Sequence, residues 1–236
     1  MIKLEIKQQV AWVSLARPEK QNALSFAMFV ELSNVIKKIK RDRSLRAVVI
    51  SGEGEHFCSG LDVAAVMKKP SNIIKLLFKW LPGNQNLAQK VVLGWQDLSI
   101  PVIAKVTGHC FGGGMQIALG ADYRIVDKNA KLAIMEARWG LCPDMGANVV
   151  LAGLMKRDQA LWLASHAGPV SAEDAKEYGL VTQLTDDVDK QTDAVLETLL
   201  ARSPDTLAAI KRITQQSYRS QQRKILAKET WSQIRL

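Results

Sequence analysis

The sequence predicts a protein of the α/β class. Short β-branched runs of strand length alternate with amphipathic stretches of helical period, and clusters of Gly, Pro and Asn separate them. A strand–strand–helix succession recurs through the first two-thirds of the 236 residues, without an internal sequence repeat. A composition of 47% hydrophobic and 23% charged residues is ordinary for a soluble globular protein. We therefore expect one large domain, or a domain with a helical appendage.

The N-terminal part predicts two strands and a long helix. Residues 2–16 predict the strands, because the first half alternates and the second half is mostly apolar. Residues 17–22 predict a turn. Ser25 is the expected N-cap of a helix that runs to about Arg43. One face of this helix carries an apolar stripe, formed by Phe29, Leu32, Ile36 and Ile39.

The next part of the chain predicts a strand at residues 45–51 and a second short segment at residues 57–62. Residues 64–98 predict short helices with breaks at 67–70 and 81–84, where prolines interrupt the pattern. This stretch is apolar and interrupted, and it fits either a lid over a pocket or a packing insertion.

The central part predicts a buried strand at residues 99–106 and a helix at residues 115–121. Two further strands are expected at residues 123–126 and 131–134. The chain from Asn148 onward predicts helices. Helix N-termini are expected at Ser171 and Ser203.

Three consecutive glycines, Gly112–Gly114, join the strand of residues 99–106 to the following helix. Glycine lets the backbone approach a ligand, because no Cβ is in the way. The glycines also place free N–H groups at a helix N-terminus, where a carbonyl oxygen that becomes an oxyanion would be stabilised. A tight strand-to-helix turn is the alternative, and the glycines alone do not decide between the two.

The formal net charge of +9 raises nucleic acid as a partner. The densest basic run, residues 37–43, lies at the end of a predicted helix, where cations complement the helix dipole. No basic ribbon with interleaved aromatic residues follows, so nucleic acid is disfavoured. A phosphate-rich small molecule would explain the surplus equally well.

Two further features bear on compartment and metals. No apolar run approaches the ~20 residues needed to cross a bilayer, and the N-terminus lacks the pattern of a signal peptide. The three cysteines, Cys58, Cys110 and Cys142, fit free thiols in a reducing cytoplasm. His56 and His109 have no companions at metal-ligand spacing, and we expect no metal site.

Five collinear segments carry a family resemblance that spans roughly residues 3–215. They are LARPEKQNAL (Leu15–Leu24), FCSGLD (Phe57–Asp62), GHCFGGGMQ (Gly108–Gln116), EARWGLCPDMG (Glu136–Gly146) and AEDAKEYGLV (Ala172–Val181). Together they resemble the signature segments of the crotonase (enoyl-CoA hydratase/isomerase) superfamily.

The resemblance implies a spiral of ββα units at residues 1–190 and a C-terminal helical trimerisation region at residues 191–236, shorter than usual in the family. It implies an acyl-CoA thioester as substrate, with no cofactor besides the coenzyme A of that substrate. A homotrimer or a dimer of trimers, without membrane association, is the implied assembly.

The resemblance also assigns the binding residues. The backbone N–H groups of Leu61 and Gly113 would hold the thioester oxygen as it becomes an enolate. The adenine and pantetheine of coenzyme A would lie along residues 20–24 and 59–63, with Lys20 as a candidate phosphate partner. The substrate-binding residues implied are Lys20, Ala23, Leu24, Ser59, Gly60, Asp62, Val63 and Gly112.

The acid–base residues depart from the pattern of the hydratases, which carry two glutamates. Here the first position is Gln116 and the second is Glu136. An amide cannot exchange a proton near neutral pH, so Gln116 can orient a group but cannot act as acid or base. The alternatives are structural. Glu136 could form a salt bridge with Arg138 or Arg124, and Gln116 could hydrogen-bond a neighbouring helix.

A single base suffices for double-bond migration, and isomerases of the family likewise carry only the later glutamate. Asp144, eight residues beyond Glu136, is a second candidate carboxylate, and dienoyl-CoA isomerases and hydroxyacyl-CoA hydrolases of the superfamily show a similar spacing. We expect isomerisation, with 2-enoyl-CoA hydration, thioester hydrolysis and catalytically weak acyl-CoA binding as alternatives. Asn22 and Asp122 match motif positions too, and we interpret both as structural.

Overall fold

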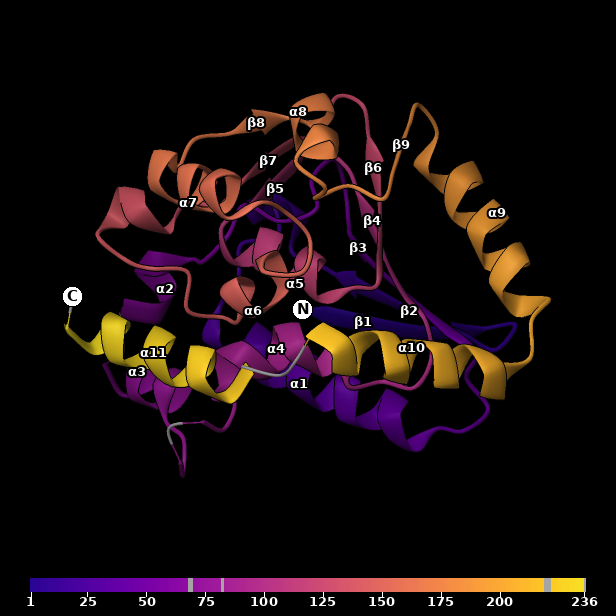
Figure 1. Cartoon of the computed structure of the whole chain (residues 1–236), viewed down its shortest axis with the longest axis horizontal. Helices are drawn as coiled ribbons and strands as arrows, with labels where there is room; N and C mark the ends of the chain where they lie inside the picture. The colour runs from indigo at the N-terminus through magenta and orange to yellow at the C-terminus, as the bar shows by residue number, and fades with distance from the viewer. Residues whose placement is uncertain (68–69, 82, 219–221, 236) are drawn as a thin grey trace.

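The computed structural model describes residues 1–67, 70–81, 83–218 and 222–235. Helices surround two β-sheets (Figure 1). The strands are β1 (Ile2–Lys7), β2 (Val10–Leu15), β3 (Ala47–Gly52), β4 (Val102–Val106), β5 (His109–Phe111), β6 (Tyr123–Asp127), β7 (Lys131–Ala133), β8 (Val170–Ser171) and β9 (Gln183–Thr185). The helices are α1 (Phe26–Arg41), α2 (Val63–Met67), α3 (Pro70–Leu77), α4 (Leu87–Gln96), α5 (Gly113–Gly120), α6 (Ala147–Leu151), α7 (Arg157–His166), α8 (Ala172–Glu177), α9 (Val188–Leu200), α10 (Pro204–Tyr218) and α11 (Gln222–Arg235). The 3-10 turns are η1 (Pro18–Lys20) and η2 (Glu136–Trp139).

The larger sheet has the strand order β1-β2-β3-β4-β6-β9, and the smaller sheet has the order β5-β7-β8. In the larger sheet β1 runs antiparallel to β2, and the other neighbouring strands are parallel. Parallel sheets are usually covered on both faces, which explains why residues 47–50 of β3 are 0% exposed. Alternate β3 residues face a core shared with α1, α4 and α5. The others face α9, the orange helix at the side of the sheet (Figure 1).

Helix α1 agrees with its prediction from sequence. The Ser25 side chain caps it by accepting a hydrogen bond from the Met28 amide at 3.4 Å. The predicted stripe is buried, and cations occupy the last turn, where they favour the C-terminal end of the dipole. Local chemistry therefore decided both ends of this helix.

The predictions were wrong at two strands in the C-terminal third. The chain from Asn148 onward was predicted as helical, yet β8 and β9 lie within it, and β9 forms an edge of the larger sheet. Both strands are too short for a period-two pattern to be visible in the sequence. Residues 57–62, predicted as a short segment after β3, contribute isolated bridges between Cys58 and Cys110 and between Leu24 and Leu61.

Residues 64–98 contain short helices, as predicted. A capping box at Asn86 and Gln89 starts α4. The predicted breaks at 67–70 and 81–84 include residues 68, 69 and 82, which lie outside the described residues. A lid function for this stretch remains a prediction.

The C-terminal helices begin as the sequence indicated. Ser171 and Asp174 form a capping box at α8, and the Ser203 hydroxyl accepts a hydrogen bond from the Thr206 amide at 3.4 Å at the start of α10. The predicted boundary between residues 190 and 191 lies within α9. Val188 before this boundary and Leu196 after it both pack on the larger sheet. Over the part of the chain described, none of the helices has the length and apolar character required to span a membrane.

Candidate active site

A cavity of about 430 Å³ lies where the 57–63 stretch, the glycine turn and the 135–145 segment meet. Apolar side chains from α1 and from residues 63–88 form one part of its wall. Two carboxylates, Glu136 and Asp144, face the same space. An apolar cavity with a few polar groups is typical of a small-molecule site.

One wall of the cavity is fixed by backbone pairing around Leu61. The Leu24 amide donates to the Gly60 carbonyl at 2.8 Å, and the Asp62 amide donates to the Leu24 carbonyl at 3.0 Å. In this parallel bridge the N–H of Leu61 points away from Leu24. Among the described residues it has no hydrogen-bond acceptor, so it is free to bind an oxygen in the cavity.

The facing wall is the start of α5. Gly112 has φ +48° and ψ −121°, a conformation that side-chain-bearing residues rarely adopt. A Cβ on Gly114 would lie 2.5 Å from Cys58 Cβ, so α5 meets the 57–61 stretch in direct backbone contact. In the part of the chain that the structure describes, the N–H of Gly113 also has no acceptor, as expected for the first residue of a helix. Two free N–H groups therefore border one cavity.

Glu136, the first residue of η2, is held by Gln116 on α5. The Gln116 Nε2 donates to Glu136 Oε1 at 2.6 Å. The amide cannot turn over, because Gln116 Oε1 accepts hydrogen bonds from the amides of Met145 at 3.1 Å and Ala147 at 3.3 Å. Gln116 is 0% exposed and does not line the cavity, so it orients Glu136 from behind.

The second oxygen of Glu136, Oε2, is buried without a hydrogen-bond partner among the described residues. Burial raises the pKa of Glu136, and the hydrogen bond from Gln116 acts in the opposite direction. A carboxylate oxygen that lacks a partner at a cavity wall is available to accept a proton. The alternative salt bridges are not formed. Arg124 instead donates to the carbonyls of Leu180 and Ala121, both at 2.7 Å.

Asp144 lies in the loop between η2 and α6. Burial, and next the charge of Glu136, raise the pKa of Asp144 to about 6. The charge of Lys79 acts in the opposite direction and lowers the pKa of Asp144. Two carboxylates at one cavity therefore both hold protons more tightly than exposed acids do.

Comparison with known proteins decides the family. The family model described as enoyl-CoA hydratase/isomerase matches residues 5–233. The chain belongs to the enoyl-CoA hydratase/isomerase, or crotonase, superfamily.

Individual relatives of this chain differ in the reaction that their names give. It is 31% identical over 182 residues to a 1,2-epoxyphenylacetyl-CoA isomerase of Escherichia coli, covering 77% of this chain and 68% of the relative. It is 29% identical over 186 residues to an (E)-benzylidenesuccinyl-CoA hydratase of Thauera aromatica, covering 78% and 70%. Its fold matches the crystal structure of a putative enoyl-CoA hydratase from Streptomyces coelicolor with a TM-score of 0.84 and 28% identity, covering 98% of this chain and 85% of that one. The predicted crotonase fold is confirmed, and acyl-CoA is the substrate class of the family.

The predicted substrate-binding residues fall into two groups. Ser59, Gly60, Val63 and Gly112 line the cavity together with Leu61 and Gly113. Lys20, Ala23, Leu24 and Asp62 are not among the residues that line it. Lys20 is exposed on η1, and its carbonyl accepts a hydrogen bond from the Ser59 hydroxyl at 3.4 Å. Leu24 is buried in the core.

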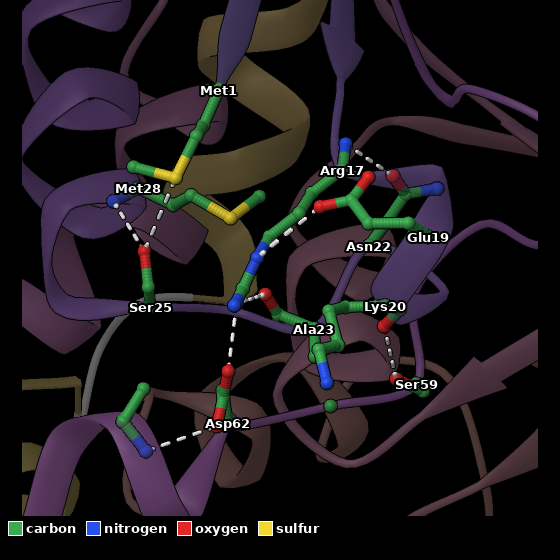
Figure 2. Close-up of polar contacts among 12 residues, drawn as sticks. Met1, Arg17, Glu19, Lys20, Asn22, Ala23, Ser25, Met28, Ser59 and Asp62 are labelled. Carbon is green, nitrogen blue, oxygen red and sulfur yellow. Dashed lines mark hydrogen bonds and ion pairs between the residues drawn. The ribbon is translucent and has the colours of Figure 1, made fainter.

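Asp62 has a structural partner that the sequence did not suggest. Figure 2 shows the Arg17 guanidinium between Asp62 and the Ala23 carbonyl, at 2.8 and 3.1 Å. The other Asp62 oxygen accepts from the Ala65 amide at 3.0 Å at the start of α2. Arg17 thus ties the 17–24 turn to the stretch that carries Leu61, and its position in the first signature segment was the only signal.

The residues interpreted as structural behave as such. The Asn22 Nδ2 donates to the carbonyls of Glu53 at 2.9 Å and His56 at 2.7 Å. Asp122 accepts from the Val102 amide at 2.8 Å and pairs with Lys211 at 2.6 Å. His56 stacks on His109 with ring centroids 4.1 Å apart, and within the described ranges no group of His, Cys, Asp and Glu is arranged to hold a metal ion.

Glu229 on α11 is a buried acid that the sequence analysis missed. It is 4% exposed, and burial raises its pKa to about 7. Its hydrogen-bond donors are Gln89 Nε2, the amides of Gly146 and Asn148, and Asn148 Nδ2, at 3.1 to 3.3 Å. It is one glutamate in a polar helix, and no sequence pattern distinguishes it.

This pKa predicts a dependence of stability on pH. A carboxyl whose pKa is higher in the folded chain than in the unfolded chain loses stabilising free energy as pH rises through the interval between the two values. The raised pKa of Glu229 corresponds to about 3 kcal/mol at full burial. We expect the free energy of unfolding, measured with urea, to fall between pH 4.5 and 8. The free energy of unfolding of the Glu229→Gln variant should fall less over the same range. Parallel curves for the two proteins would contradict this expectation.

Proposed function

We propose that this protein shifts the double bond of a 3-enoyl-CoA thioester to position 2. The observation that carries the proposal is the arrangement of Glu136, a residue that lines the cavity, with Oε1 held by Gln116 and Oε2 without a hydrogen-bond partner among the described residues. A base that must remove a proton and return it needs one free oxygen and a fixed orientation.

The chemistry uses one base and two backbone donors. The amides of Leu61 and Gly113 hold the thioester oxygen, and Glu136 removes a proton from C2. The electrons of the broken C–H bond move into a dienolate, whose negative oxygen the two amides stabilise. Glu136 then returns the same proton to C4, and the double bond between C2 and C3 forms. No water or redox partner enters the balance.

Gln116 argues against hydration by the paired-glutamate route of the family's hydratases. Hydration across a double bond needs a group that delivers a proton and a group that activates water. The amide of Gln116 can supply neither, and its polar atoms already bind Glu136, Met145 and Ala147. In the Gln116–Glu136 pair, Glu136 is therefore the proposed base, and Gln116 holds its side chain in place.

Product analysis on a panel of acyl-CoA thioesters tests the proposal. The panel contains 2-enoyl, 3-enoyl, 3,5-dienoyl and 3-hydroxyacyl thioesters, and each product is identified by mass spectrometry and diene absorbance. We expect 3-enoyl-CoA to become 2-enoyl-CoA without change of mass. An untouched 3-enoyl-CoA beside a 2-enoyl-CoA that gains water would favour hydratase activity, released coenzyme A would indicate hydrolysis, and binding without turnover would indicate a carrier.

Asp144 favours a second candidate reaction, the migration of both double bonds of a 3,5-dienoyl-CoA. That reaction moves a proton from C2 to C6, farther than one carboxylate reaches. Asp144 lines the same cavity as Glu136 and has a pKa of about 6. It could donate a proton to C6 while Glu136 removes the proton from C2.

The variant Asp144→Asn separates the two reactions. If Asp144 serves only the dienoyl substrate, turnover of 3-enoyl-CoA changes by less than about threefold while turnover of 3,5-dienoyl-CoA falls by about 10² or more. Steady-state rates on both substrates are the measurement. Equal losses on both would assign Asp144 to the common step, and no loss on either would remove it from the chemistry.

Coenzyme A recognition remains part of this proposal. Lys20 is exposed beside the Ser59 hydroxyl, and a cation there could pair with a phosphate of the substrate. Assembly into a homotrimer is proposed from the family resemblance.

A further inference from the structure

Four consecutive amides at the start of α6 bind two different side chains in alternation. The amides of Met145 and Ala147 donate to Gln116 Oε1, at 3.1 and 3.3 Å. The amides between and after them, Gly146 and Asn148, donate to Glu229 Oε2 and Oε1, at 3.1 and 3.3 Å. One backbone segment is therefore clamped between Gln116 and Glu229.

The Glu229 side of the clamp is saturated with donors. Asn148 Nδ2 adds a hydrogen bond to Oε1 at 3.1 Å, and Gln89 Nε2 adds one to Oε2 at 3.2 Å. Gln89 cannot turn its oxygen toward Glu229, because that oxygen accepts from Lys79 Nζ and the Asn86 amide, both at 3.2 Å. Every polar group facing Glu229 in these contacts is a donor, so the side chain accepts all of these hydrogen bonds as a carboxylate, the form that predominates above its pKa of about 7.

The clamp connects the C-terminal helix to the proposed base. Glu229 fixes the 145–148 segment, and that segment fixes the oxygen of Gln116. The oxygen in turn decides which way the Gln116 amide faces, and the amide holds Glu136 Oε1 at 2.6 Å. Glu229 itself does not line the cavity.

We infer that Glu229 is a positioning residue, which orients Glu136 through the 145–148 amides and Gln116. The inference rests on the proposed function, in which Glu136 is the base. When glutamine replaces Glu229, an NH₂ group takes the place of one of the two oxygens that accept from the 145–148 segment, and the Gln116 amide is held less firmly. Glu136 then spends less time in the orientation that reaches C2, while the cavity wall that binds the substrate stays in place.

The test compares Glu229→Gln with the matched variant Glu197→Gln, which makes the same change at an exposed position of α9. At pH 8 we expect Glu229→Gln to lower kcat by roughly tenfold or more with KM changed less than about twofold. Glu197→Gln should leave both constants unchanged. A purely stabilising role would lower the melting temperature without changing kcat of the folded enzyme.

A double-mutant cycle with Gln116→Met tests the route of the effect. If Glu229 acts through Gln116, Glu229→Gln should cost less than about twofold in kcat once Gln116 is Met. Multiplicative losses in the double mutant would overturn the inference.

Hydrogen exchange at the amides of residues 145–148 gives a readout that needs no activity. We expect these amides to exchange at least about tenfold faster in Glu229→Gln, and unchanged exchange would overturn the inference whatever the enzyme catalyses. If Glu229→Gln does not fold, Asn148→Ala removes one donor from an exposed position, and faster exchange with a smaller loss of kcat is expected. A wild-type protein that leaves 3-enoyl-CoA untouched would instead overturn the proposed function, and the exchange result would still judge the clamp.

Discussion

Replacing Glu136 by glutamine is expected to lower the turnover of 3-enoyl-CoA by about 10² to 10⁴-fold, the usual contribution of a general base. The substitution keeps the shape of the side chain, and its amide oxygen can still accept the hydrogen bond from Gln116 Nε2. The Oε2 position becomes an NH₂ group, which cannot take a proton from C2. The dissociation constant for acyl-CoA, measured by calorimetry, should change less than about threefold.

The control for this variant is Glu173→Gln, an exposed position in the first turn of α8. Its rates should equal those of the wild type. Turnover of Glu136→Gln within a factor of ten of the wild type would exclude Glu136 as the base, and Asp144 would then be the carboxylate to test.

Removing the N–H of Gly113 is expected to cost about 10² to 10³-fold in kcat, or ~3 kcal/mol of transition-state stabilisation. Gly113→Pro does this with little other change, because Gly113 is the first residue of α5, where proline is tolerated. The side chain would meet Leu24 Cδ1 and Met145 Sδ at 3.1 and 3.2 Å from the Cβ position, and both are ends of flexible side chains.

Gly113→Ala is the matched control, since it introduces the same Cβ and keeps the N–H. We expect the alanine variant to lose less than about tenfold in kcat and the proline variant the full 10² to 10³-fold. Similar losses in both variants would mean that the added carbon, and not the missing donor, causes the effect. Rates at saturating 3-enoyl-CoA, with circular dichroism to confirm folding, decide between the two.

Much of the fold could be predicted because its signals are local. Ser25 and the apolar stripe of α1 lie within a few turns of one another, so a single segment contains both the cap and the face that is buried. The same holds for the capping box at Ser171. The strand β9 could not be found this way. It has three half-buried residues, and pairing with β6 makes it a strand.

The residues proposed for catalysis were also predicted from the sequence. The three glycines indicated free N–H groups, and the family resemblance pointed to Leu61, Gly113 and Glu136. The sequence further showed that position 116 is an amide, which removed one proton-transfer group from the hydratase pattern. The structure adds what that amide does: it donates to Glu136 and accepts from the start of α6.

The sequence by itself determined the α/β class and the family, and it predicted Glu136 as a base. Only the tertiary structure decided what holds the Glu136 side chain in place. Glu229 lies 83 residues from Gly146 in the chain, and Arg17 lies 45 residues from Asp62. Neither pair can be predicted from a short stretch of sequence. A buried carboxylate is stabilised by hydrogen-bond donors that come together only when the chain folds. The residues of the signature segments can be predicted because they recur at a fixed spacing in the sequence. The residues that hold them in place, such as Glu229 and Arg17, come from distant segments, and only packing brings them together.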